Sequence, residues 1–211
     1  MPPKTKFTKE EIVAKAMDVV RNKGMDCLTA RELGAALGTS TRPIFTYFDS
    51  MEQVKQEVIE GVKQLYSDYV SKGLEMNPPF KGVGMQIVRF ATVEKMFFKL
   101  LFMENTAFNS LYDMMITDRH YDRIVENVSQ VFRLSKYQAE FVYHNLWTYG
   151  YGLAVMCATE ACIFTDEELS EALGNACRCF VTGAKLDYDE HVKMMPAKNA
   201  VVDPCDDIYG I

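Results

Sequence analysis

A helix-start pattern that occurs five times constrains the fold of this chain more than any other feature of its sequence. In this pattern a Ser or Thr is followed three residues later by Glu or Gln, and each side chain can bond the other residue's backbone N–H at the start of a helix. Each occurrence precedes a segment with apolar residues at helical spacing. The pairs are Thr8/Glu11, Thr29/Glu32, Ser50/Gln53, Ser135/Gln138 and Thr165/Glu168. No stretch shows the sustained alternation of hairpin strands, so the sequence predicts an all-α fold.

The bounds of the expected helices follow from these starts and from the residues that end helices. Gly24 stands where the first helix needs its C-cap, and Met76-Asn77-Pro78-Pro79 ends the fourth helix, because proline cannot continue it. The last ~20 residues contain two Pro and several Asp, and we expect a loose tail there. The expected helices cover residues 9–23, 30–37, 41–48, 51 towards 76, 82–93, 95–104, a stretch that ends at 132 with a bend near 117–118, 136–159 and 166–186.

Charge is unevenly distributed along the 211 residues. The net charge of −6 argues against a generic nucleic-acid coat protein. Residues 1–50, however, carry eight Lys or Arg and six Asp or Glu, whereas residues 51–211 carry fifteen and twenty-three. A mildly basic head on an acidic body is typical of a small DNA-binding module joined to a second part, although chance could also produce an asymmetry of this size.

The N-terminal sequence and the cysteines indicate the cell compartment. The opening MPPKTKFTKEEI contains no apolar run that could serve as a secretory signal. The six cysteines show neither zinc nor redox spacing, and without an export signal we expect them to be reduced. We therefore expect a cytoplasmic protein.

Residues 141–159, FVYHNLWTYGYGLAVMCAT, contain no Asp, Glu, Lys or Arg. A helix that is apolar on all sides must be buried on all sides. A membrane span is one alternative, but His144, Asn145, Thr148 and three Tyr dilute its hydrophobicity. We expect instead that this helix is covered partly by its own core and partly by a second subunit. Together with residues 166–186 it would form an intersubunit four-helix bundle, which predicts a homodimer and no membrane contact.

Residues 29–54 have the pattern of a helix-turn-helix. Two short helices are separated by Gly38, which permits a tight turn. Thr29 is expected to cap the first helix and Ser40 the second, with Pro43 in the first turn of the second helix. Its apolar residues Ile44 and Phe48 would pack inward. The side chains left to face a DNA groove are Thr39, Thr41, Arg42, Thr46 and Tyr47. A purely structural helix pair is the alternative.

Individual DNA contacts can be assigned from these positions. Arg42 would reach the groove floor, where a bidentate contact to guanine is the commonest specific contact. Thr29 and Arg31 would hold a phosphate from the preceding helix, while Thr46 and Tyr47 would lie over the backbone. In the alternative interpretation Arg42 only pairs with an acid such as Asp49 or Glu52.

Aromatic residues in the second part are candidates for an effector pocket. They offer apolar surface with a few polar tips and few charges nearby, which favours an apolar or aromatic small molecule that is weakly charged. The alternative is that they are simply core. The candidates are Phe98, Phe102, Tyr112, Met115, Tyr143, Trp147 and Tyr151.

No catalytic constellation is evident in the sequence. The three His residues are scattered, and neither a zinc-protease motif, a phosphate-binding Gly-rich loop nor a Gly-x-Ser-x-Gly element occurs. We therefore expect a protein that is not an enzyme and that needs no cofactor and no metal.

The head resembles the TetR family of bacterial transcriptional regulators over residues 8–58. The resemblance is carried by Thr29, Arg31, Leu33, Gly34, Gly38, Ser40, Ile44, Phe45, Phe48, Glu52 and Val54. The rest of the chain resembles the family only in layout. This resemblance implies a homodimer that binds a palindromic double-stranded DNA operator, usually as a repressor, and that releases it when a small molecule enters the C-terminal domain. It also implies three parts: a DNA-binding domain at 1–49, a ligand-sensing and dimerisation domain at 50–188, and a tail at 189–211.

The chain departs from the family pattern at four positions: Thr39, Arg42, Phe45 and Met51. Phe45 replaces a common Tyr whose hydroxyl often reaches a phosphate, and Met51 replaces a frequent Lys. Lys55 and Tyr47 are candidates to supply the missing phosphate contacts. An alternative function follows from the same departures, namely a helical protein that acts mainly through a protein partner with weak or lost DNA binding.

Overall fold

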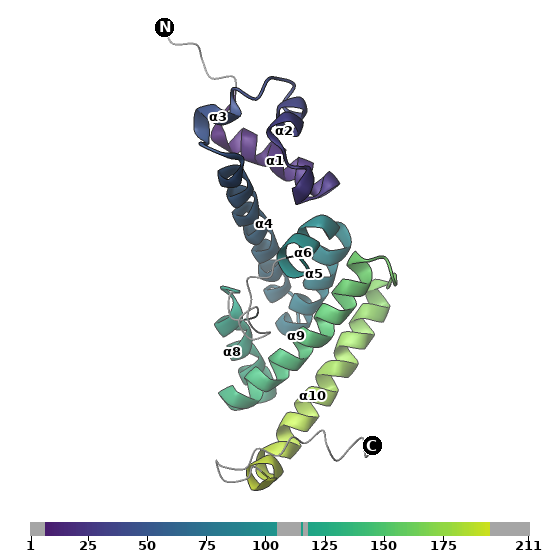
Figure 1. The fold of residues 1–211 in the computed structure, drawn as a ribbon. Coiled ribbons are helices and arrows are strands. Elements are labelled where there is room, and N and C mark those ends of the chain that lie inside the picture. The colour runs from purple at the N-terminus through teal and green to yellow at the C-terminus, as the bar shows by residue number, and fades with distance from the viewer. Residues whose placement is uncertain (1–6, 105–114, 116–117, 195–211) are drawn as a thin grey trace, which may run out of the picture.

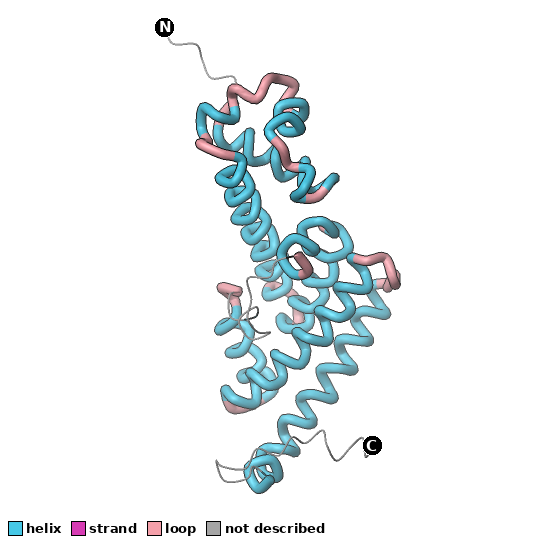
Figure 2. Tube along the Cα trace, in the orientation of Figure 1, coloured by secondary structure: helices cyan, strands magenta, loops and turns pink. Residues whose placement is uncertain are grey.

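The structure is a computed structural model, and it describes residues 7–104, 115 and 118–194. All regular structure in this described part is helical (Figures 1 and 2). The head contains α1 (Lys9–Lys23), the 3₁₀ turn η1 (Met25–Cys27), α2 (Ala30–Ala36) and α3 (Ile44–Tyr47). Helix α4 (Met51–Leu74) leads from the head into the body, which contains α5 (Pro79–Val93), α6 (Lys95–Phe102), α8 (Tyr121–Phe132), α9 (Lys136–Ala158) and α10 (Asp166–Met194). The expected all-α fold, with a three-helix head and a larger helical part, is confirmed.

At each of the five expected helix starts, the Ser or Thr hydroxyl accepts a hydrogen bond from the backbone N–H three residues on. Thr8, Ser135 and Thr165 form full capping boxes with Glu11, Gln138 and Glu168. Two pairs form only half of the box. The Thr29 and Ser50 hydroxyls accept from the N–H groups three residues on, but the Glu32 side chain pairs with Lys23 and that of Gln53 bonds the N–H of Asp49.

The start of α3 differs from the prediction. The α-helix begins at Ile44, with Pro43 as its N-cap, and not at residue 41. The Ser40 hydroxyl accepts from the N–H of Arg42, two residues on, at 3.4 Å. A helix cap can also make a bond of this spacing, but here residues 41–43 form a turn that leads into α3.

Other helix bounds also differ from the expected ones: α4 ends at Leu74, α6 at Phe102 and α9 at Ala158. Helix α5 begins at Pro79 and not at residue 82, because proline is well tolerated at the first helical position. Helix α2 ends at Ala36, and α10 continues past residue 186 to Met194. Residues 189–194 of the expected tail at 189–211 belong to α10. The rest of the expected tail, and Thr117 at the expected bend, lie outside the described residues.

One continuous set of buried side chains runs through head and body. Helix α4 contributes to both ends of it: Val54 and Val58 are buried near the head, and Tyr66 and Val70 are buried in the body. Figure 1 shows α4 leading from the head into the body, with α9 and α10 side by side along one edge. A movement of the body against α4 would therefore be passed to the head.

Candidate nucleic-acid interface and effector region

The turn between α2 and α3 is held by short backbone contacts. Gly38 adopts φ +65°, a left-handed conformation that favours glycine. The N–H of Thr39 then donates to the carbonyl of Gly34 at 2.9 Å. A Cβ on Gly34 would lie 3.2 Å from the carbonyl oxygen of Thr39, so the glycine allows the turn to close onto α2. This fixes the position of α3 relative to α2.

Helix α3 is apolar on its inner face and polar or aromatic on its outer face. Ile44 and Phe48 are buried against the head, as expected. The Thr46 hydroxyl donates to the carbonyl of Arg42 at 3.2 Å, and the Tyr47 hydroxyl donates to the carbonyl of Phe7 at 2.9 Å. The hydroxyl protons of Thr46 and Tyr47 therefore have acceptors within the head, and their oxygens remain able to accept.

The head's cations fall into two groups. Lys9 pairs with Glu57, Lys15 and Arg21 with Asp18, Arg21 also with Glu94, Lys23 with Glu32 and Lys55 with Glu52. In the described residues from 7 to 58, only Arg31 and Arg42 have no carboxylate within 4.0 Å. Both are exposed, one on α2 and the other in the turn before α3. Among the head residues that the structure describes, they are the two cations that can give their whole charge to an external anion.

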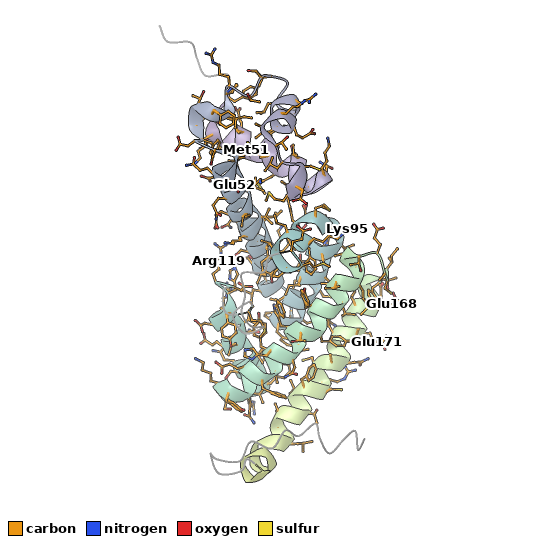
Figure 3. All side chains as sticks on the ribbon, viewed as in Figure 1. Met51, Glu52, Lys95, Arg119, Glu168 and Glu171 are labelled. Atoms are coloured by element: carbon orange, nitrogen blue, oxygen red, sulfur yellow. The ribbon has the colours of Figure 1, made fainter. Side chains whose placement is uncertain are left out.

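The alternative pairing of Arg42 with Asp49 or Glu52 does not form. Glu52 pairs with Lys55 at 3.1 Å, and Asp49 accepts from the side chain of Gln53 at 3.1 Å. Met51 and Glu52 stand at the start of α4, at the junction of head and body (Figure 3). Lys55 is therefore committed in part to Glu52.

Nine of the ten predicted DNA-contact residues lie in the head, and Lys55 lies on α4. The nine lie at the start of α2, in the turn and on α3: Thr29, Arg31, Thr39, Ser40, Thr41, Arg42, Pro43, Thr46 and Tyr47. None is fully buried.

Four of the seven predicted effector-pocket residues are buried in the core of the body: Phe98, Met115, Tyr143 and Trp147. Phe102 and Tyr151 are partly buried against this core, and Tyr112 lies outside the described residues. Four of the rings pack on one another. Phe98 and Phe102 have ring centroids 5.2 Å apart, and Trp147 and Tyr151 stack at 5.3 Å. The hydroxyl of Tyr151 donates to the carbonyl of Phe102 at 3.0 Å. Met115 is buried with them.

A cavity beside this aromatic cluster is small. Tyr143 and Trp147 line it together with residues of α5, α8 and α10, and its volume is about 30 Å³. Ligand pockets hold ~300–1,000 Å³, so this cavity has room for water but not for an organic effector. An effector that enters here must separate side chains that are in contact.

Two polar atoms at the edge of this core are buried without a hydrogen-bond partner: Asp118 Oδ2 and Tyr143 Oη. The other oxygen of Asp118 accepts from the N–H of His120 at 2.8 Å. Burial raises the pKa of the Asp118 carboxyl and raises that of Tyr143 well above its ordinary range. No local sequence pattern indicates that Asp118 is buried, because its burial depends on residues far away in the chain.

The start of α8 is attached to α4 by polar contacts. His120 Nε2 lies 2.8 Å from the Ser67 hydroxyl and 3.2 Å from that of Ser71. Arg119, labelled in Figure 3, donates to the side-chain oxygen of Gln64 at 3.1 Å. The edge of the aromatic core is thus connected to the helix that leads to the head.

Helix α9 exposes an uncharged stripe on the edge of the body. Its largest exposed side chains are Tyr137, Phe141, Tyr149 and Met156, of which Tyr137 is 62% exposed. Nearby, a Cβ added at Gly152 on α9 or at Gly183 on α10 would meet no atom within 4 Å. The exposed side chains and the open glycines leave room for another helix to approach.

Three findings concern metal binding, membrane spanning and similarity to curated proteins. No group of three or more His, Cys, Asp or Glu in the described part of the chain could hold a metal ion. None of the helices within that part is both long enough and apolar enough to cross a membrane. No curated protein matches the chain.

A family model does match the head. The model describes the bacterial regulatory proteins of the tetR family, and it matches residues 12–58. These residues extend from α1 into the first third of α4 and include the turn and both helices described above. The body is helical in layout and lies outside the match.

Proposed function

We propose that this chain, whose residues 12–58 match the model of the tetR family of bacterial regulatory proteins, is a member of that family and a ligand-responsive repressor that binds a palindromic operator as a homodimer. The family match supports a DNA-binding transcriptional regulator. The observation that carries the proposal is the pair of head cations without a carboxylate partner, Arg31 and Arg42, on the helix-turn-helix itself. Their neighbours are neutralised within the chain, so these two are available to DNA.

The proposed DNA contacts fall into two groups: contacts to phosphates that position the protein, and contacts to bases that recognise the sequence. Arg31 and the Thr29 start of α2 suit a phosphate, because the N-terminus of a helix offers free N–H groups and a positive dipole. Arg42 suits a guanine edge in the major groove. In a dimer the two α3 helices would enter the major groove at two places on the same face of the DNA. These places would be ~34–36 Å apart or a multiple of that distance.

The dimer would form through α9 and α10. The uncharged stripe on α9 supports this interface, because Tyr137, Phe141, Tyr149 and Met156 remain exposed on a helix with few charges. Burial of this stripe against the same surface of a second copy would complete a four-helix bundle.

The effector would act on the aromatic core of the body. An apolar or aromatic small molecule between Phe102, Trp147 and Tyr151 would displace packed rings. Contacts from His120 and Arg119 to α4 would pass that displacement to the head. A ligand that binds the displaced arrangement better lowers DNA affinity by linkage.

The test is selection of operators from a random duplex library by the full chain, followed by gel shift. We expect an enriched palindrome whose affinity falls for Arg42→Ala and is kept by Lys15→Ala, since Lys15 is already paired with Asp18. If the protein enriches no sequence at physiological salt, the alternative function through a protein partner is favoured.

A further inference from the structure

Phe45 is a large apolar side chain on the outer face of α3 that the proposed function leaves unused. It is 48% exposed, while its neighbour Ile44 is fully buried. None of the described residues forms a ring pair or a cation contact with it. A single exposed ring is ordinary on most surfaces. Here it is informative because it lies among the side chains that face DNA.

The backbone places Phe45 beside Arg42. The N–H of Ile44 donates to the carbonyl of Thr41 at 3.1 Å, and that of Thr46 donates to the carbonyl of Pro43 at 3.3 Å. The helical winding of α3 therefore extends back through the turn. Since residues three apart are neighbours on a helical surface, Phe45 and Arg42 project from the same side.

The chemistry of the ring limits what it can contact in a groove. A phenyl group can neither donate nor accept a hydrogen bond to a phosphate, unlike the tyrosine that the family pattern often has at this position. The one prominent apolar group in the major groove is the C5-methyl of thymine, and apolar side chains such as Phe contact it. Packing there covers the exposed ring without desolvating a charge.

We propose that Phe45 is a specificity-determining residue that packs on the C5-methyl group of a thymine in each operator half-site, close to the base that Arg42 contacts. This inference rests on the proposed binding of DNA by α3. It requires that the half-site contain a thymine whose methyl group, and not its hydrogen-bonding edge, sets the affinity.

Replacement of thymine by deoxyuridine tests the proposal, since it removes only that methyl group. In the enriched operator each thymine is replaced in turn, and the full-length wild type is compared with Phe45→Ala. At one position per half-site, deoxyuridine should weaken the wild type about fourfold, because burial of one such group is worth ~0.8 kcal/mol. The same replacement should leave Phe45→Ala unaffected.

Phe45→Tyr and Met76→Ala provide the controls. Phe45→Tyr keeps the ring and should keep the deoxyuridine effect. Met76, also exposed but at the end of α4, lies far along the chain from the head, and its variant should behave as wild type. Circular dichroism checks that each variant is folded.

Three outcomes overturn the assignment. The proposed contact is contradicted if no thymine of the half-site weakens binding when it is replaced by deoxyuridine. It is also contradicted if the replacement weakens Phe45→Ala as much as it weakens the wild type. If Phe45→Ala binds the operator as tightly as the wild type does, the ring contributes nothing to operator affinity. Failure of the wild type to enrich any duplex is a distinct result, because it overturns the proposed function as well.

Discussion

At the scale of single residues, the head distinguishes cations that stabilise the protein from cations that are free to bind. Lys55 illustrates the first kind: it was a candidate phosphate contact, but its ammonium lies 3.1 Å from Glu52. Arg31 and Arg42 illustrate the second kind. The spacing of Lys55 and Glu52 on one helix permits their pairing, but the sequence could not show that Arg42 stays unpaired, because Asp49 and Glu52 bond other side chains in the folded head.

We predict that Arg42→Ala and Arg31→Ala weaken operator binding in different ways. Arg42→Ala should cost ~1–3 kcal/mol on the selected operator and relax the preference at one base position per half-site. Arg31→Ala should weaken all sequences about equally and lower the salt slope by ~1 per half-site. Gel shifts across a salt series, with Lys15→Ala as the paired control, measure both. Unchanged affinity and base preference in a folded Arg42→Ala would make Arg42 a structural residue.

Asp118 gives a prediction about stability and pH. Burial raises the pKa of its carboxyl in the folded state, so the folded state holds this proton more tightly than the unfolded state does. The stabilisation is therefore present at low pH and is lost as the pH rises from the ordinary value of about 4 through the folded pKa. Asp118→Asn keeps an acceptor for the N–H of His120 and carries no charge.

The unfolding temperature of Asp118→Asn should accordingly exceed that of wild type near neutral pH, and the difference should shrink on acidification. Thermal unfolding followed by circular dichroism over this pH range measures the difference. A difference that stays constant, or that grows in acid, would show that the charge of Asp118 is not the cause.

At the scale of elements, local signals determine how well the sequence predicts each helix. Helix α1 has the expected bounds because Thr8 and Gly24 each act through hydrogen bonds to residues three or four positions away. The start of α3 differs from the prediction because the Ser40 hydroxyl bonds the N–H of Arg42 as a cap can, whereas the backbone forms a turn over residues 41–43 before the α-helix begins at Ile44. The contact of His120 with Ser67 joins residues far apart in the chain, and no local pattern announces it.

The crossing of α4 and α5 is a further contact that sequence patterns do not show. A Cβ on Gly73 would lie 2.5 Å from Cα of Val83, and one on Gly82 would lie 2.3 Å from the carbonyl oxygen of Gly73. Real side chains do not tolerate such distances to backbone atoms, so an added methyl must push the two helices apart. These glycines set how closely α4 approaches the body.

We therefore expect Gly73→Ala to destabilise the protein by ~1–3 kcal/mol or more, as overpacking of a core does. Gly174→Ala on α10 is the matched control, because its Cβ would meet only the end of the Arg178 side chain, at 3.9 Å. The control should be neutral or more stable by up to ~1 kcal/mol, since alanine favours helix over glycine. Urea unfolding of both variants decides, and equal stabilities would contradict the close crossing.

At the scale of the whole molecule, the head and the body are joined by more than α4. Arg21 at the end of α1 donates to Glu94, between α5 and α6, at 2.8 Å, and its guanidinium lies 4.9 Å from the centre of the Phe97 ring. The head is thus held to the body at α4 and again at α6. An effector that moves the body would act on both connections, and in the proposed dimer the two heads would need a fixed spacing to fit one operator.

That spacing requires a dimer, and the stripe on α9 predicts one. Sedimentation of the wild type at micromolar concentration should give twice the chain mass, with little dependence on salt, because the stripe is uncharged and its burial is driven by the hydrophobic effect. Phe141→Glu places a charge in the middle of the stripe and should shift the protein to monomer. Val131→Glu, on the exposed side of α8, should remain a dimer. Operator affinity should fall only in Phe141→Glu, since a monomer loses the gain from two linked half-site contacts. A wild type that sediments as a monomer would contradict both the interface and the proposed binding of a palindrome.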